Sequence, residues 1–402
     1  MSVQSRAPAR SRPGAPPPRL RRDQFLALAA SAAAALGLVL TVGPAASAAT
    51  HTAAPAAPLH TYHVAPNGTD TSGSCTANTV HNAFPTIADA LACAVSGDAI
   101  SLAPTGTTPY QGFGTVSQNI TIAAASGANA RTVTVDATIS SNLTVAAGAT
   151  VTVSGVTIDG SNDVQSANVT NDGVLTLTRD AITNNVINSG ILTSGSSAAN
   201  AYLTLNATTV SGNVGGGGGG IDVVNGTTLT ADNSTIANNL AGSTVGGIDL
   251  NPGTSATFVN STITGNQDSP IGGLQVWPGA SATLSNTIIA RNSGDTAPDC
   301  HGTLTNGPGG HNLIGNATIC TGLANGVNGD QVGVTTPGLV PLASNGGPTD
   351  TAALATGSPA IGGGDAATCE QAPVVNKDQR GDSRNATTRG VCDIGAYDTG
   401  GA

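Results

Sequence analysis

A large aliphatic residue recurs about every 26 positions along most of the chain, in a background of Thr, Ser, Asn and Gly. The intervals between successive members are 24, 28, 26, 27, 26 and 25. The members are Ile158, Ile182, Val210, Ile236, Ile263, Ile289 and Ile314. Such a period is typical of solenoids, in which each repeat buries its apolar side against the next. We therefore expect one repeat to form one coil of a stacked structure.

Within each repeat, apolar and polar residues alternate over short runs such as 228–230 and 256–258, separated by Gly, Asn and Asp. This alternation predicts short β-strands. No repeat holds a sustained helical pattern, which excludes the ankyrin, tetratricopeptide and leucine-rich architectures. The sequence therefore predicts an all-β fold, a single-stranded parallel β-helix. Parallel β connections are almost always right-handed, so we expect a right-handed coil.

An Asn follows each aliphatic marker by three positions over most of the repeats. Asn tolerates the left-handed backbone of a tight corner, and its amide can bond the equivalent amide one coil away. This predicts a structural ladder; a polar binding strip is the alternative. The ladder residues are Asn185, Asn213, Asn239, Asn266 and Asn292.

The two ends of the chain depart from the repeat, as terminal repeats of a solenoid do. Residues 85–95 place apolar side chains on one helical face and predict a short helix over the first coil. After Cys320 the period is lost. The predicted parts are a signal peptide (1–48), a linker (49–60), an N-terminal cap with the short helix (61–112), the β-helix (113–320) and an irregular C-terminal cap (321–402).

The N-terminal segment 1–48 resembles an export signal. Arginines precede an apolar run at 25–42, and Ala46-Ser47-Ala48 follows as a small-residue cleavage pattern. A retained membrane anchor is the alternative, because the run just reaches the length needed to span a bilayer. We expect cleavage and a secreted product, with Sec and twin-arginine export both open.

Six cysteines fall into three local pairs, with separations of 18, 20 and 23 along the chain. Export leads to an oxidising compartment, and stacked coils keep distant pairs apart, so three local disulfides are expected. Zinc is the alternative, but the sequence has no Cys-x-x-Cys motif. The expected pairs are Cys75 with Cys93, Cys300 with Cys320, and Cys369 with Cys392.

The charge balance excludes several classes of partner. Residues 49–402 contain seven basic and 22 acidic residues, a net charge of −15. Such a surface repels phosphate backbones and anionic lipids, so neither nucleic acid nor a membrane is expected as a partner. Charged residues are only 9% and aromatic residues 2% of the chain, which disfavours helical bundles and doubly wound folds.

The candidate chemistry is one row of polar residues, Asp222, Asp249 and Gln275, spaced 27 and 26 positions apart. Because Ile221 and Val223 should point inward, these side chains should point outward into solvent. A lyase or glycosidase needs clustered carboxylates with a base or a metal, and neither acidic coil contains Lys or Arg. We therefore expect a solvated row, with ligand or cation binding as the alternative, and predict no catalytic residue, metal or cofactor.

The C-terminal motifs resemble a known bacterial family. They are 339–349 (LVPLASNGGPT), 357–361 (GSPAI), 378–381 (DQRG) and 392–397 (CDIGAY). They are similar to those of secreted right-handed parallel β-helix proteins with a choice-of-anchor Q domain, and the repeats resemble those of polymorphic outer-membrane proteins. The resemblance implies a pectin-lyase-like fold and an extracellular, cell-surface location. It implies no reaction.

These observations predict a secreted, monomeric, non-catalytic β-helix that presents a surface or binds an extracellular polysaccharide or the cell envelope. The alternative is a polysaccharide lyase or glycoside hydrolase. A groove with converging acids and a base would favour the enzyme, whereas a flat face of Thr, Ser and Asn would favour binding.

Overall fold

The computed structural model describes residues 57–70, 75–76, 78–136, 142–161, 166–195, 201–242, 244–386 and 390–400. Residues 57–402 form one compact unit. The predicted signal peptide and most of the predicted linker lie outside the described residues. The compact unit thus begins within the predicted linker.

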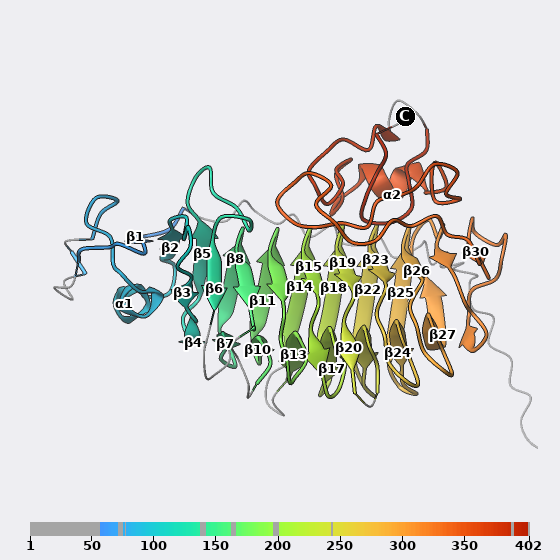
Figure 1. The fold of residues 1–402 in the computed structure, drawn as a ribbon, viewed down its shortest axis with the longest axis horizontal. Coiled ribbons are helices and arrows are strands. Elements are labelled where there is room, and N and C mark those ends of the chain that lie inside the picture. Colours follow the sequence, from blue (N-terminus) through green and yellow to red (C-terminus); the bar gives the residue numbers. More distant parts are fainter. Residues whose placement is uncertain are drawn as a thin grey trace, which may run out of the picture. The chain divides into compact units, whose positions relative to one another are not determined.

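The chain winds as a right-handed parallel β-helix whose coils stack along three strand faces, here named A, B and C in the order in which each coil visits them (Figure 1). The predicted fold class is confirmed. Face A comprises β1 (Thr61–Val64), β2 (Ala99–Leu102), β5 (Ile120–Ala124), β8 (Thr150–Ser154), β11 (Val174–Thr178), β14 (Tyr202–Asn206), β18 (Thr228–Asp232), β22 (Ser255–Val259) and β25 (Ser281–Ser285).

The other two faces are built in the same way. Face B comprises β3 (Tyr110–Gln111), β6 (Thr134–Asp136), β9 (Thr157–Asp159), β12 (Ala181–Thr183), β15 (Thr209–Ser211), β19 (Thr235–Ala237), β23 (Thr262–Thr264), β26 (Ile288–Ala290), β28 (Leu313–Ile314) and β30 (Gln331–Val332). Face C comprises β4 (Gly114–Val116), β7 (Leu143–Val145), β10 (Val169–Asn171), β13 (Ile191–Ser194), β17 (Ile221–Val224), β21 (Ile248–Leu250), β24 (Leu274–Val276) and β27 (Cys300–Asn306).

Minor strands complete the stack. β27 passes from face C to face A, and β29 (Cys320–Thr321) pairs with it. β16 (Val214–Gly215) and β20 (Leu240–Ala241) pair in the turns before face C. Strand pairing thus begins at β1 and continues to β30, on both sides of the predicted 113–320 span.

The aliphatic markers form one continuous stack on face B. Each pairs in register with its equivalent in the next coil, from Ile158 in β9 to Ile314 in β28. All of them are buried. Neighbouring strands lie about 4.8 Å apart, so each marker covers the one before it and excludes water from the interior. The predicted repeat is therefore the core of the fold.

The N-terminal end is covered by a short helix, α1 (Ile87–Cys93), within the predicted 85–95 segment. It begins because the Thr86 side chain accepts a hydrogen bond from the backbone N–H of Asp89 at 3.1 Å. Ile87, Ala90 and Leu91 are buried on its inner side.

The C-terminal segment, which includes α2 (Ala366–Glu370), folds back along face B (Figure 1). Buried Gln379 joins it to the coils: its amide donates to the Thr209 hydroxyl at 2.7 Å and accepts from the Thr235 hydroxyl at 2.6 Å. Buried Arg384 donates to the Asn233 side chain at 2.7 Å. Face B is therefore covered over β19, β23 and β26, whose residues are all buried, whereas the outward residues of β9 and β12 are only partly buried.

A ladder of buried amides runs along the corner between faces B and C. The amide of Asn213 donates to the carbonyl oxygen of the Asn239 side chain, Asn239 to Asn266, and Asn266 to Asn292, each at 2.9 Å. Asn185 differs, since its amide donates to the Ser166 carbonyl at 2.7 Å. These side chains are buried, so they offer no binding strip.

The left-handed corner lies one residue earlier than expected. The ladder residues do not have positive φ; the residues directly before them do, with φ between 56° and 68°. Those residues are Asn184, Gly212, Asn238, Gly265 and Arg291. The turn needs one residue that tolerates this backbone and a second whose amide points inward. Two consecutive residues meet these needs, the first with its positive φ and the second, an Asn, with its side chain.

A second ladder, not predicted, runs along the corner between faces A and B. Each backbone N–H donates to the side-chain oxygen of the equivalent residue one coil on. Its members are Asp180, Thr208, Ser234, Ser261, Thr287, Asn312 and Asp330. The residue type varies along this second ladder, so no single amino acid recurs at its positions in the sequence.

All three local disulfides are present: Cys75–Cys93, Cys300–Cys320 and Cys369–Cys392. The first ties the N-terminal region to α1, the second joins two consecutive coils, and the third closes a loop within the C-terminal segment. Within the described ranges, no helix has the length and apolar character needed to cross a bilayer.

Candidate functional site

The predicted polar row is real and lies on the outer side of face C. Asp222 of β17 pairs in register with Asp249 of β21, which pairs with Gln275 of β24. His301 of β27 pairs with Gln275 and extends the row by one coil. The register follows from the strand alternation, because the flanking apolar residues of each strand fill the interior.

The row is not the solvated surface that the sequence predicts. Asp249 is 5% exposed and Gln275 is fully buried, while Asp222 is half-buried. The preceding glycine-rich turn lies directly over the row: a β-carbon at Gly217 would stand 2.5 Å from Oδ2 of Asp222. Two side chains at the next outward positions also contact the acids: Asn251 contacts Asp222, and Trp277 contacts Asp249. The expectation failed because strand alternation sets direction, whereas turns and neighbouring side chains set exposure.

Burial changes the chemistry of both acids. Desolvation raises the pKa of Asp222 to about 6. A hydrogen bond from the Asn251 amide at 3.0 Å acts in the opposite direction and lowers this pKa in part. Desolvation and the nearby charge of Asp222 raise the pKa of Asp249 to about 6 as well. The indole N–H of Trp277 donates to Oδ1 of Asp249 at 2.8 Å and partly offsets this. The pair is therefore anionic above about pH 6 and takes up protons below it.

Trp277 leaves part of its ring available to a ligand, whereas Gln275 is buried. Trp277 is the chain's single Trp, is 40% exposed, and is held at its N–H by Asp249. Oε1 of Gln275 lies 2.7 Å from Nδ1 of His301, while its Nε2 is buried without a hydrogen-bond partner in the described structure. Face C thus combines an aromatic surface with carboxylate, amide and imidazole groups.

Sequence reasoning missed His301 and Trp277 as members of this site. His301 lies one full repeat after Gln275, so the row could have been extended by counting. Trp277 is two positions after Gln275, on the same side of the strand. The described residues contain no cluster of three or more His, Cys, Asp or Glu that could hold a metal ion.

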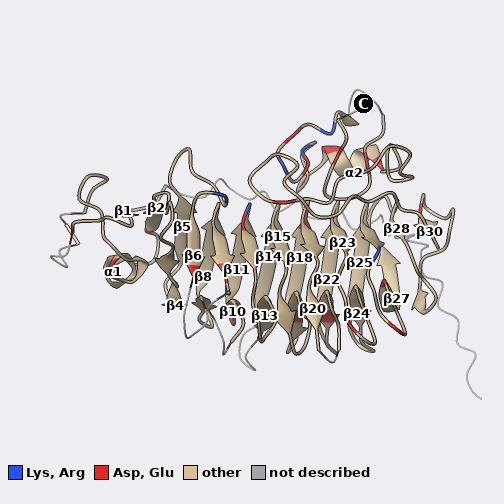
Figure 2. Ribbon diagram, in the orientation of Figure 1, with Lys and Arg blue, Asp and Glu red and all other residues tan. Residues whose placement is uncertain are grey.

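Face A carries a different surface, one outward Thr per coil in continuous register. The row is Thr121, Thr152, Thr176, Thr204, Thr230, Thr257, Thr283 and Thr305. None of these residues is buried. The strands of face A are almost free of charged residues in Figure 2, whereas acidic residues occur near β20, β24 and β27.

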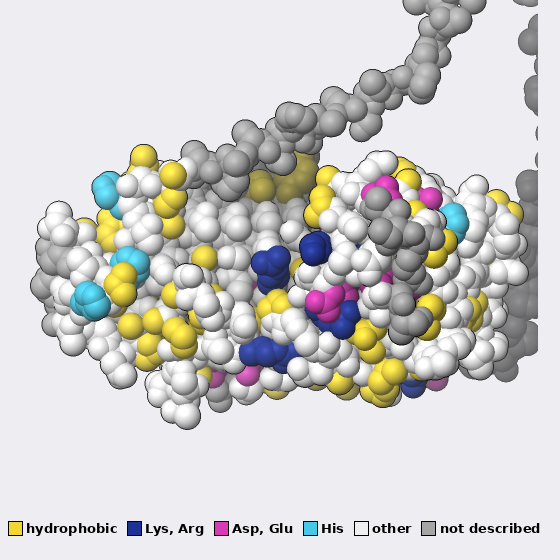
Figure 3. Space-filling view, turned by 90° about the horizontal axis from the view of Figure 1, so that it is seen from above, with side chains coloured by type: hydrophobic (Ala, Val, Ile, Leu, Met, Phe, Trp, Pro, Cys, Tyr) yellow, Lys and Arg dark blue, Asp and Glu magenta, His cyan; other side chains and the backbone are white. Residues whose placement is uncertain are grey.

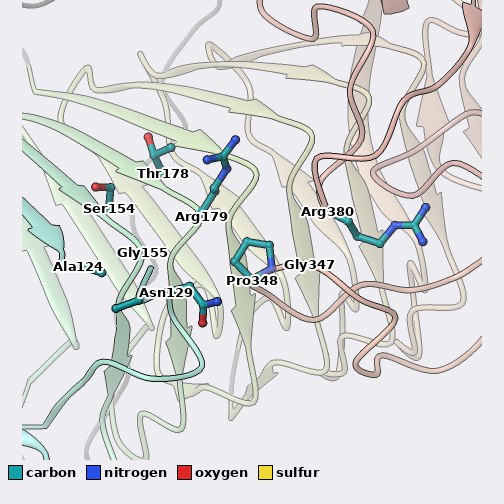
Figure 4. A pocket seen from close by; sticks show the side chains of 10 residues that line it. Ala124, Asn129, Ser154, Gly155, Thr178, Arg179, Gly347, Pro348 and Arg380 are labelled. Carbon is teal, nitrogen blue, oxygen red and sulfur yellow. The ribbon is translucent and has the colours of Figure 1, made fainter. Parts of the chain in front are cut away.

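A groove of about 780 Å³ lies where the coils meet the C-terminal segment (Figure 4). Ser154, Thr178 and Arg179 line it from the coils, and Pro348 and Arg380 line it from the C-terminal side. Nothing in the sequence pattern brings these two segments together, because they lie far apart in the chain and only the first belongs to the repeat.

Comparisons with known proteins address the fold. No family model matches the chain, and no curated protein matches its sequence. A solved structure described as the crystal structure of pectate lyase Pel9A aligns with 85% of this chain and 96% of its own, at 16% identity and a TM-score of 0.51. The fold is a pectate-lyase-like parallel β-helix. At this identity the likeness concerns architecture alone.

Proposed function

We propose that the protein is a secreted, non-catalytic β-helix that binds an extracellular polysaccharide along face C. The observation that carries the proposal is the half-exposed ring of Trp277 beside the polar row. Sugar rings have apolar C–H faces that pack on aromatic rings and hydroxyls that need hydrogen-bond partners. Face C supplies both within two neighbouring positions of adjacent coils.

The geometry favours a ring that is fixed before the ligand arrives. The hydrogen bond from the indole N–H to Asp249 holds Trp277, so binding costs little side-chain entropy. The half-buried carboxylate of Asp222 is an acceptor for hydroxyls, whereas the unpartnered Nε2 of Gln275 is buried and cannot contact a ligand. Because both acids are anionic above about pH 6, we expect a neutral polysaccharide there.

An enzymatic alternative rests on the same acids. Two neighbouring carboxyl groups with a pKa of about 6 resemble the acid and base of a glycoside hydrolase. Against it, the side chains described above include no Lys or Arg, and each acid already accepts a hydrogen bond from its own neighbour. The uncharged Thr row of face A also favours a binding or structural role.

Location and partners belong to the same proposal. Three disulfides support an oxidising, extracellular compartment. The apolar N-terminal run and the motifs that resemble those of choice-of-anchor Q proteins support secretion and association with the cell surface. We infer that the folded unit acts as a monomer on a polymer or on the cell envelope.

Retention and cleavage on a panel of neutral and uronate polysaccharides test the proposal. Binding at face C should change the fluorescence of Trp277, which is the only Trp and so reports this site directly. Trp277→Ala should weaken retention at least about tenfold. Tyr202→Ala is the matched control, because Tyr202 is a 45% exposed aromatic on face A.

The outcomes separate the alternatives. Unchanged retention of the Trp277→Ala variant would refute binding at this ring. Release of new reducing or unsaturated ends by the parent, lost on Asp249→Asn, would establish the enzymatic alternative instead.

A further inference from the structure

We propose that the groove of Figure 4 is a second binding site, specific for an oxyanion (phosphate, sulfate or carboxylate) carried by an extracellular polymer. The site lies between the coil turns at Ser154 and Thr178 and the C-terminal residues around Pro348. It is distinct from face C in position and opposite to it in charge. The proposal is independent of the function assigned to Trp277.

Basic residues are rare in this protein and they gather here. Residues 49–402 contain seven, and three of these lie at the groove: Arg179 and Arg380 line it, and Arg131 donates from Nε to the carbonyl of lining residue Gly347 at 3.0 Å. Figure 3 shows several basic side chains close together on this surface. In a body of net charge −15, such a cluster is a local exception.

Two of the three arginines are structural. Arg131 forms an ion pair with Asp350 at 3.0 Å, which fixes the 347–350 wall against the coils. Arg380 is 11% exposed at its side chain, pairs with Asp378 at 2.7 Å, and lies 3.9 Å from the ring centre of Tyr397. Both cations are therefore compensated and hold the groove in shape.

Arg179 is the uncompensated cation. It is exposed, and in the described structure it forms no ion pair within 4.0 Å. The hydroxyls of Ser154 and Thr178 line the same wall and donate no hydrogen bond to any described residue. A guanidinium with two neighbouring hydroxyls is a suitable donor set for an oxyanion, which Arg can bind through two parallel bonds.

The backbone at Arg179 is strained. Its φ is 57°, a left-handed conformation that costs a long side chain about 1 to 2 kcal/mol. The equivalent corner residues of the other coils are Gly155, Ala207, Asn233, Asn260 and Asn286; all have positive φ, and most are of the types that tolerate this backbone best. Arg at this corner therefore carries a cost in stability that Asn would not, and a contact between its guanidinium and a ligand in the groove would offset this cost.

The volume indicates more than a bare ion. About 780 Å³ is in the range of small-molecule sites, large enough for a charged sugar unit or a phosphodiester together with part of the adjoining chain. Arg179 and the two hydroxyls select the charge, and the Gly347–Pro348 wall is placed to contact the neutral remainder.

Arg179→Asn provides the test, because Asn suits the left-handed corner and the variant should fold at least as stably as the parent. Binding is measured to dextran sulfate, polyphosphate and polygalacturonate, with neutral dextran as the reference. We expect the parent to bind at least one polyanion in a salt-dependent manner and the variant to bind it at least about tenfold more weakly. Trp277→Ala should leave this binding unchanged.

The three polyanions identify the anion that is recognised, and the variants show whether the proposal fails. The preferred polyanion shows whether phosphate, sulfate or carboxylate is recognised. Equal affinity of the parent and the Arg179→Asn variant would overturn the proposal, as would the absence of binding to all three. Loss of polyanion binding in Trp277→Ala but not in Arg179→Asn would place the anion at face C and refute the groove.

Discussion

Replacing Asp249 by Asn should stabilise the protein at pH 8, although it alters a buried, hydrogen-bonded side chain. Asp249 is 5% exposed, and burial together with the charge of Asp222 raises its pKa from 3.8 to about 6. A carboxyl group with a native pKa above its unfolded value binds protons more tightly when folded. Its ionisation therefore destabilises the native state, and the penalty is complete above about pH 6.

The magnitude follows from the difference between the two pKa values. A difference of about two corresponds to about 3 kcal/mol of unfolding free energy. Asn keeps an oxygen for the indole N–H of Trp277, but a neutral acceptor is weaker by about 1 kcal/mol. We expect a net gain of about 2 kcal/mol at pH 8. Two exposed carboxylates about 4 Å apart in water would repel each other by only ~1 kcal/mol, so relief of surface repulsion alone would give a smaller gain.

Urea denaturation followed by circular dichroism measures the effect at several pH values. The gain should shrink as the pH falls from 6 towards 4, because the parent carboxyl becomes protonated in the native state. Asp295→Asn serves as the control, since that acid is exposed and should change stability little. A loss of stability for Asp249→Asn at pH 8, or a gain independent of pH, would refute the assignment of a buried, disfavoured carboxylate.

Three further predictions concern the core, cations and disulfides. Ile236→Asp should lower the unfolding free energy by several kcal/mol because it buries an unpaired charge, whereas Thr230→Asp on the outer face should not; equal melting would contradict the register. Millimolar Ca²⁺ should leave the melting temperature of the parent unchanged; a rise that is absent from Asp249→Asn would indicate a cation site. Non-reducing digestion should release three separate disulfide-linked peptide pairs, and a Cys75–Cys392 link would contradict the stacked coils.

The periodic part of the structure could be predicted because one repeat constrains every other. Once Ile236 and Ile263 are placed one coil apart, the strands between them and the row through Asp222 and Asp249 follow in register. The same counting would have reached His301. Local cysteine spacing was sufficient for the disulfides, because stacked coils bring only near neighbours together.

Exposure and long-range contacts could not be inferred in this way. A glycine turn lies over Asp222, and Trp277 contacts Asp249; neither effect is visible in strand alternation. The groove at Arg179 depends on a C-terminal segment that returns along the coils, with Gln379 bonded to Thr209. The second ladder mixes acids, hydroxyls and amides, so its geometric equivalence has no counterpart in residue type.

On the C-terminal side, the side-chain amide bonds at both corners end at an aspartate, and this gives these bonds a direction and an end point. Asn292 donates to Asp299 at 3.0 Å, and Asn312 donates to Asp330 at 3.1 Å. A carboxylate accepts such bonds but has no amide to offer to a following coil. A coil inserted between two Asn residues of the ladder could therefore continue the amide hydrogen bonds, whereas a coil added after Asp299 could not. The end of the side-chain amide bonds is thus set chemically, by where an amide gives way to an acid, while strand pairing continues past Asp299 to β30.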